Sequence, residues 1–298
     1  MKKFLFIILI CSFLLTGCNN QNKENLEKEK FLTEIDYFSN TIANMLNNLN
    51  NISLNNYELV SDKVSSNNSD EGGSNQSSSG SSSSHGGDKE SQSSSQGEEQ
   101  GEKSSQSQSN ITITEMRNNS VLNTDSEKVD WDFMRKEIEN MNNSWNVVML
   151  DLYNNNVSND DILAFGDLLN QAILSIKNED KQGTLVNLSS LYVYLPMFLS
   201  VVSAENSKQN IESTKSQIYI AYTAASVDDW NSAIVSVSNA ENVFLNVLND
   251  TEYTKNKENK VNKTYMLIKD LQFSATNNDK NLFFLKYKNL MESINQLT

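Results

Sequence analysis

The chain has 298 residues and a formal net charge of −14, with 38 acidic and 24 basic residues. This balance argues against a nucleic-acid partner and against binding to anionic lipid head groups, because both need a basic surface. The only histidine, His85, lies in a stretch of serine and glycine, so a Ser-His-Asp triad and a histidine metal site are excluded. No glycine-rich phosphate-binding loop occurs in a segment expected to be ordered. We therefore expect no catalytic residues, no cofactor and no enzymatic activity.

Residues 1–18 have the pattern of a secretion signal. Two lysines precede an apolar stretch, residues 4–15, which is too short for an ordinary transmembrane helix. The stretch ends with Leu15-Thr16-Gly17-Cys18. This tetrapeptide resembles the lipobox of bacterial lipoproteins, in which a leucine and two small residues precede a cysteine.

The lipobox resemblance implies a location for the protein. Residues 1–17 would be removed as a lipoprotein signal peptide, and Cys18 would carry a diacylglyceryl group as the mature N-terminus. Each buried methylene of an acyl chain contributes about 0.8 kcal/mol, so the lipid would hold the protein on the membrane. We expect the protein on the extracytoplasmic face of the bacterial cell membrane, lipid-anchored. Cys11 would leave with the signal peptide, so the mature domain has no thiol for a disulfide or a metal.

A long helix is expected over residues 23–61, after a short lipidated tether at residues 18–22. Two sets of apolar residues interleave at a spacing of seven: Phe31, Phe38, Met45 and Ile52, with Ile35, Ile42 and Leu49. This pattern is typical of a coiled coil over about three heptads. A coiled-coil dimer is one interpretation. Packing within the same chain is favoured, because the regular charge pairs that would specify a partner are missing.

Residues 62–127 form an insertion between the first and second helices. Serine, glycine, glutamine and glutamate dominate residues 62–110, and large apolar side chains are nearly absent. Such a segment cannot bury enough surface to offset the entropy of ordering it, so we expect a disordered insertion. Residues 111–127 remain open, because Ile111 and Ile113 alternate like a strand with no partner strand in sight.

Residues 128–298 contain a repeated amphipathic helix. Four aspartates open the copies at a spacing of 49 or 50 residues: Asp130, Asp180, Asp229 and Asp279. Mainly apolar residues follow at offsets 8, 11, 15 and 18, which is the spacing of one helical face. A second type of amphipathic helix alternates with the first. We therefore predict an all-α fold of four antiparallel helical hairpins, about eight helices, in a bundle or short solenoid that packs with helix 23–61.

The hairpins loosely resemble tetratricopeptide-type solenoids, whose repeats are shorter, so the pattern points to no particular family. The four opening aspartates lie at the same end of an antiparallel stack. One hypothesis is an acidic rim that binds Ca²⁺ or a basic partner. The favoured alternative is helix capping, in which each carboxylate accepts hydrogen bonds from free backbone N–H groups.

Aromatic residues offer a second candidate surface. Trp131 and Trp230 each follow an opening aspartate and would either anchor a glycan or peptide or pack the hairpin turn. Tyr192, Tyr219 and Tyr222 would either line a ligand groove or fill the core. In both cases the packing role is favoured, because other repeats carry lysine or plain aliphatic residues at matching positions.

The sequence therefore predicts a lipid-anchored, non-catalytic scaffold or binding protein of the cell envelope, with a protein or envelope component as its partner. The alternative is a solute- or cation-binding lipoprotein of a transport or sensing system. A concave pocket with converging polar groups would favour the solute-binding alternative. An exposed apolar stripe on a flat surface would favour the scaffold.

Overall fold

The computed structural model describes residues 17–54, 129–203 and 205–298, with side chains described from residue 26 onward except that of residue 27. Within these residues there are nine helices and no strand. Residues 1–16 of the predicted signal peptide, and the predicted insertion over residues 62–127 with its open segment 111–127, lie outside the described residues. The helices are α2 (Gly17–Leu49), α3 (Trp131–Asn154), α4 (Asn159–Lys177), α5 (Lys181–Val202), α6 (Asn206–Ser226), α7 (Trp230–Leu248), α8 (Thr251–Thr254), α9 (Glu258–Thr276) and α10 (Lys280–Ile294).

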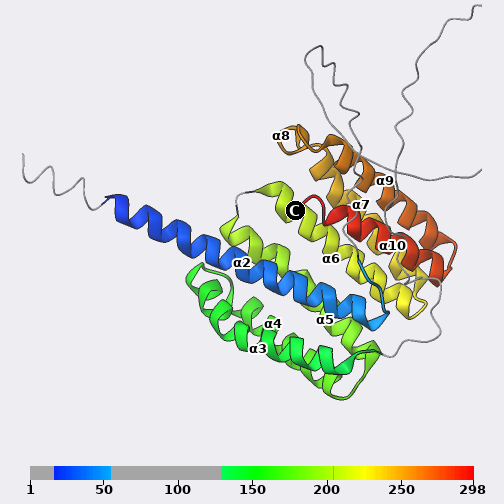
Figure 1. The fold of residues 1–298 in the computed structure, drawn as a ribbon, viewed down its shortest axis with the longest axis horizontal. Coiled ribbons are helices and arrows are strands. Elements are labelled where there is room, and N and C mark those ends of the chain that lie inside the picture. Colours follow the sequence, from blue (N-terminus) through cyan, green and yellow to red (C-terminus); the bar gives the residue numbers. More distant parts are fainter. Residues whose placement is uncertain (1–16, 55–128, 204) are drawn as a thin grey trace, which may run out of the picture. The chain divides into compact units, whose positions relative to one another are not determined.

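The long helices form two four-helix bundles (Figure 1). In the first bundle, α2 contacts α3 and α5, and α4 contacts the same two helices. In the second bundle, α6 contacts α7 and α10, and α9 contacts the same two helices. The bundles meet chiefly where α5 packs against α6. The four predicted hairpins therefore combine two at a time, and each pair closes around its own set of apolar side chains.

The repeat alignment is confirmed by burial. Every side chain at the four repeated offsets is 7% exposed or less. These residues are Ile138, Leu188, Val237 and Tyr287; Met141, Leu191, Ala240 and Leu290; Trp145, Leu195, Phe244 and Ile294; and Val148, Phe198, Val247 and Leu297. The fold therefore follows from one apolar stripe repeated at helical spacing.

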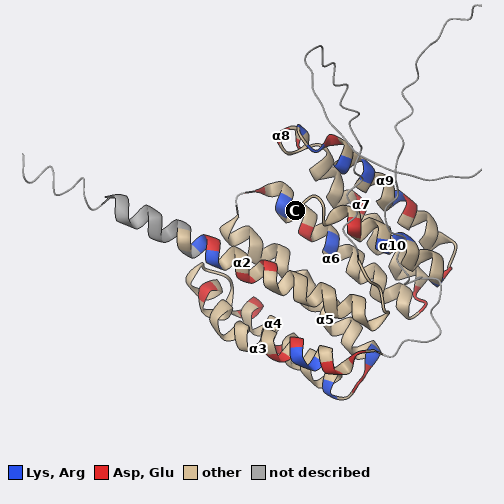
Figure 2. Cartoon of the chain, viewed as in Figure 1, with Lys and Arg blue, Asp and Glu red and all other residues tan. Residues whose placement is uncertain are grey.

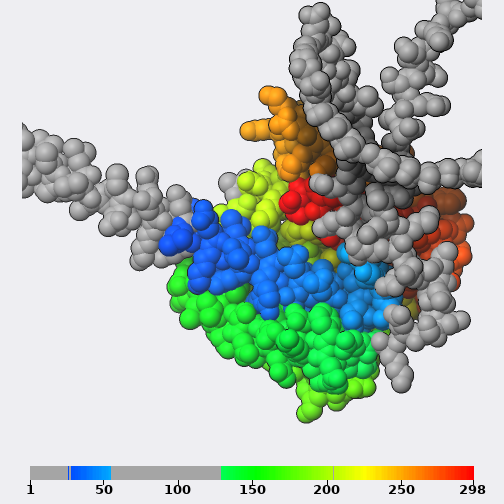
Figure 3. Space-filling view, in the orientation of Figure 1, coloured from blue at the N-terminus to red at the C-terminus, as the bar shows by residue number. Residues whose placement is uncertain are grey.

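Helix α2 packs within the chain, with all seven residues of its apolar seam buried. Figure 3 shows it lying along α3 on one face of the molecule. The predicted limits of this helix were wrong at both ends. It begins at Gly17, so residues 18–22 are helical, and it ends at Leu49 rather than extending to residue 61.

The early end of α2 has a clear backbone cause. Asn51 adopts a positive φ of 54°, and the N–H of Ile52 donates to the carbonyl of Asn47 at 2.9 Å. This is the hydrogen-bond pattern of a Schellman motif, in which an apolar residue beyond the helix end folds back onto the core. Ile52 is 4% exposed. It fits the heptad spacing because it is buried, although it lies outside the helix.

Helix α5 is the most apolar helix, and of the described residues only its stretch is long and apolar enough to cross a membrane. Nine of its side chains are buried, and it packs against α2, α4 and α6. Helix α5 is therefore a central core helix. It also places Tyr192 beside α2 and α6, where the two bundles meet.

Candidate ligand-binding site

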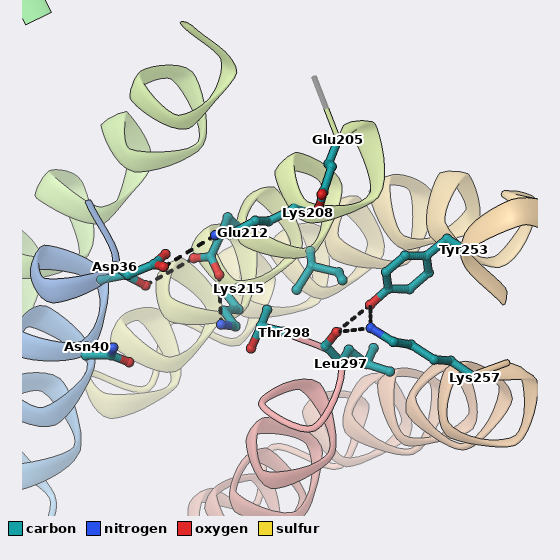
Figure 4. Close-up of a pocket in the computed structure, with 12 residues that line it drawn as sticks. Asp36, Asn40, Glu205, Lys208, Glu212, Lys215, Tyr253, Lys257, Leu297 and Thr298 are labelled. Atoms are coloured by element: carbon teal, nitrogen blue, oxygen red, sulfur yellow. Dashed lines mark hydrogen bonds and ion pairs between the residues drawn. The ribbon is translucent and has the colours of Figure 1, made fainter. Parts of the chain in front are cut away.

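A pocket of about 370 Å³ opens beside the contact between the two bundles. Helix α2 supplies one wall, the first turns of α6 supply the floor, and the segment around α8 and the last residues supply the other wall (Figure 4). Two other hollows in the described part of the chain are more open to solvent than this pocket, and asparagine residues make up much of their lining. The lining residues are Asp36, Ser39, Asn40, Glu205, Lys208, Ile211, Glu212, Lys215, Tyr253, Lys257, Leu297 and Thr298.

The floor of the pocket is a buried ion pair on α6. Lys215 Nζ lies 2.8 Å from Glu212 Oε1. Glu212 is 6% exposed and Lys215 is 7% exposed. The two residues are three apart, so they stand on neighbouring positions of one helical face. Most charged side chains avoid such burial unless they are paired and hydrogen-bonded.

Three donors surround the Glu212 carboxylate. Its Oε2 accepts hydrogen bonds from the hydroxyls of Tyr192 at 2.6 Å and Ser39 at 3.1 Å, and its Oε1 accepts from Lys215. Burial alone would raise the pKa of Glu212. The charge and the hydrogen bond of Lys215, with the two hydroxyls, outweigh burial and lower this pKa below its ordinary value. Glu212 is therefore a fixed anion.

The walls carry two further lysines. Lys208 Nζ lies 3.3 Å from the Asp36 carboxylate on α2. Lys257 Nζ donates to the backbone carbonyl of Leu297 at 2.9 Å and to the hydroxyl of Tyr253 at 3.2 Å. Figure 4 shows these groups on opposite sides of the Glu212–Lys215 pair. Three ammonium groups, two from α6 and one from the segment that connects α8 and α9, thus line one small space.

The four opening aspartates are helix caps. Each carboxylate accepts a hydrogen bond from the backbone N–H three residues later, at 2.9 to 3.1 Å. The residues are Asp130 in α3, Asp180 in α5, Asp229 in α7 and Asp279 in α10. Across the described ranges, no group of three Asp, Glu, His or Cys side chains could hold a metal ion. The capping interpretation therefore accounts for these four residues.

Basic residues also lie at this end of the hairpins. Lys280 pairs with Asp228 at 2.9 Å, and Arg135 bridges Asp132 and Glu179 at 2.8 and 3.1 Å. Figure 2 shows both charge signs around the start of α3 and the turn before α5. The predicted rim is thus of mixed charge, because the turns that hold the aspartates also hold lysine and arginine.

The aromatic candidates pack against the core. Trp131 and Trp230 are half-buried against it, and the Trp230 ring lies 6.1 Å from that of Phe283. Tyr192, Tyr219 and Tyr222 are at most 1% exposed. Their rings therefore line no open groove. Tyr192 does not line the pocket, but its hydroxyl donates to Glu212, which does.

Sequence reasoning missed the residues that form the pocket. Lys215 could have been found, because it falls between Ile211 and Ile218 on the apolar stripe of α6. A lysine at a core position needs a buried partner, and Glu212 is three residues away. Ser39 gave no such signal, since its contact with Glu212 spans 173 positions along the chain.

Comparison with protein-family models, with curated proteins and with solved structures finds no match to this chain. Function must therefore be inferred from the site. A concave space with a buried ion pair at its floor and polar groups on both walls is an arrangement suited to holding a small polar molecule. Cys18 lies within α2, and its side chain is outside the described part, so its lipidation stays a prediction.

Proposed function

We propose that the protein is a lipid-anchored, extracytoplasmic, non-catalytic binding protein of the cell envelope, and that it holds a small polar solute in the pocket between α2, α6 and the C-terminal segment. The observation that carries this proposal is the buried Glu212–Lys215 pair at the floor of a pocket of about 370 Å³. Small-molecule sites range from about 300 to 1,000 Å³ and hold a few placed polar groups. The pocket fits the lower end of this range.

The lipid anchor is supported by the lipobox resemblance and by the position of α2. Its first turns extend beyond α3 and α5 (Figure 1). Leu26 is 67% exposed, and Phe31 is the first buried apolar side chain among those described. A helix rises about 1.5 Å per residue, so the turns before Asp36 would hold the pocket roughly 27 Å from Cys18. This distance would leave the solute site clear of the membrane surface.

The anchor and the binding site are tested separately. Cys18→Ala should abolish incorporation of labelled palmitate and release the protein from membranes. For the site, the melting temperatures of the wild type and of Asn40→Trp are measured with each member of a solute library. The Asn40→Trp substitution places a large ring on the exposed wall of the pocket. Asn44→Trp, one turn along the same face of α2 and outside the pocket, is the matched control.

The expected result is at least one solute that raises the melting temperature of the wild type and of Asn44→Trp but not of Asn40→Trp. If no solute distinguishes the two variants, the pocket is not a binding site. If labelled palmitate enters the Cys18→Ala protein, the anchor is misassigned.

A scaffold function is the second candidate, because two large apolar side chains on α9 are exposed. Met266 is 64% exposed and Phe273 is 65% exposed. They are seven residues apart and so share one face of the helix. Crosslinking on intact cells should capture a partner that Met266→Ser with Phe273→Ser loses. Capture that is unchanged in this double variant would leave the solute site as the better supported function.

A further inference from the structure

We propose that the solute is a small organic anion, and that its carboxylate or phosphate group binds the ammonium group of Lys215 in the pocket. This inference rests on the proposed function and goes beyond it by naming the chemical class of the ligand. It is drawn from the unequal hydrogen-bonding of the two charges at the pocket floor.

The anionic partner at the floor has no need of a ligand. The Glu212 carboxylate accepts hydrogen bonds from Ser39 and Tyr192 on one oxygen and from Lys215 on the other. A carboxylate offers about four acceptor positions, and three are filled by groups that come from three different helices. A ligand cation would have to compete with these fixed donors. The floor is therefore poorly suited to amines and guanidines.

The cationic partner is in the opposite position. An ammonium group has three donors, and Glu212 is the one partner of Lys215 among the residues that the structure describes. Lys215 is only 7% exposed, yet it lines the pocket. Buried donors without acceptors cost free energy. The remaining donors of Lys215 therefore need acceptor oxygens, which the pocket can admit from water or from a ligand.

The pocket lining carries three ammonium groups and three side-chain carboxylates, those of Lys208, Lys215, Lys257, Asp36, Glu205 and Glu212. The preference for an anion therefore rests on how these charges are paired. Lys208 is held by Asp36 at 3.3 Å, a long contact between two partly exposed side chains. Lys257 donates to a neutral carbonyl and a phenol, so no carboxylate of the described residues cancels its charge in these contacts. Charge-assisted hydrogen bonds are about twice as strong as neutral ones. An anion at Lys215 would therefore gain charge-assisted hydrogen bonds, with Lys257 as a second cation in the pocket lining.

The test uses the lipidated full-length chain in detergent, in a buffer free of phosphate and carboxylates. Succinate and inorganic phosphate are the anionic probes, succinamide is the neutral probe, and putrescine is the cationic probe. Binding is measured by calorimetry, and sodium chloride at matched ionic strength corrects for screening. We expect succinate or phosphate to bind, with the other two probes at least tenfold weaker.

Variants locate the binding. Lys215→Met alone leaves Glu212 buried without its cation and risks misfolding, so the main variant is Lys215→Met with Glu212→Gln. It should lose anion binding by about ten- to hundredfold, the loss expected for one charge-assisted contact. Lys208→Gln on the pocket wall should weaken binding less, and Lys263→Gln on the exposed surface of α9 is the matched control.

Three results would overturn the inference. Anion binding unchanged in the Lys215→Met with Glu212→Gln variant places the anion elsewhere. Absence of binding by both anions removes the class named here. Binding of succinamide or putrescine that Asn40→Trp abolishes, with no anion bound, refutes the anion while leaving the solute-binding function standing. The solute-binding function itself fails only if no solute distinguishes Asn40→Trp from Asn44→Trp.

Discussion

Single residues decide how the pocket floor responds to pH. The Glu212 carboxylate is buried, which alone raises its pKa, but Lys215 and the hydroxyls of Tyr192 and Ser39 lower it below the ordinary value of 4.5. The unfolded chain therefore binds a proton more readily than the folded chain. The stabilisation from this lowered pKa is complete above about pH 4.5 and is lost as the pH falls through the lower folded value.

The first prediction concerns this acid limb. In Glu212→Gln, urea unfolding at several pH values between 3 and 7 should show a free energy of unfolding that falls less steeply below pH 4.5 than in the wild type. The absolute stability should also drop, because Lys215 loses its buried partner. The comparison is therefore one of slopes, with Glu258→Gln at an exposed position as the control. Equal slopes in wild type and Glu212→Gln would show that the pair does not set the acid response.

At the scale of the helix, one face of each repeat carries the stability. The repeated offsets put apolar side chains on a single stripe, and the hairpin turns are closed by residues with positive φ. Glu179, Asp228 and Asn278 have φ of 55°, 62° and 54°, and each immediately precedes a capping aspartate. The helix start and the preceding helix end are therefore specified within two adjacent residues.

The second prediction contrasts two positions on α7. Phe244 is fully buried and Asn239 is exposed. Phe244→Ala should lower the free energy of unfolding by about 3–5 kcal/mol, because it removes packed apolar surface and leaves a cavity. Asn239→Ala should change it by about 0.5 kcal/mol or less. Urea midpoints that coincide for the two variants would refute the repeat alignment.

The sequence predicted the helices better than their assembly. Periodicity located the long helices α3 to α7, α9 and α10 and the seam of α2, because burial on one face leaves a local pattern at helical spacing. It did not predict the four-residue helix α8, which has no buried residue. Periodicity misplaced the end of α2. Ile52 lies beyond the helix, but it is buried and keeps the heptad spacing, so the pattern does not show where the helix stops. It also missed the pocket, because Ser39 and Glu212 meet only through tertiary packing, which leaves no spacing to read.

At the scale of the whole molecule, polar contacts join the two bundles along α2. The hydroxyl of Tyr222 on α6 donates to the carbonyl of Leu46 at 2.8 Å and accepts from the amide of Asn50 at 2.7 Å. The hydroxyl of Tyr287 on α10 donates to Asn47 Oδ1 at 2.7 Å. Leu46 belongs to the last turn of α2, whose carbonyls lack partners within the helix. Residues of the second bundle thus complete the end of a helix in the first.

The third prediction tests this junction. Tyr222→Phe keeps the ring but removes the hydroxyl, so it leaves the Leu46 carbonyl without that donor. The free energy of unfolding should fall by about 1–3 kcal/mol, the cost of a buried polar group that loses its hydrogen bond. Tyr153→Phe on α3 is the control, because Tyr153 is 61% exposed. A change no larger than in this control would mean that the junction adds nothing to stability.

The position of α2 in the first bundle has a consequence for the order of folding. Helix α2 is synthesised before its neighbours, yet α3 and α5 follow only after residues 55–128. The apolar seam of α2 therefore stays unburied while a long stretch of chain is synthesised. In the second bundle the contacts join helices that are close along the chain, because α6 contacts α7, α7 contacts α9, and α9 contacts α10. Contacts between distant segments form slowly, so we expect the helix that is made first to be the last of its bundle to be buried.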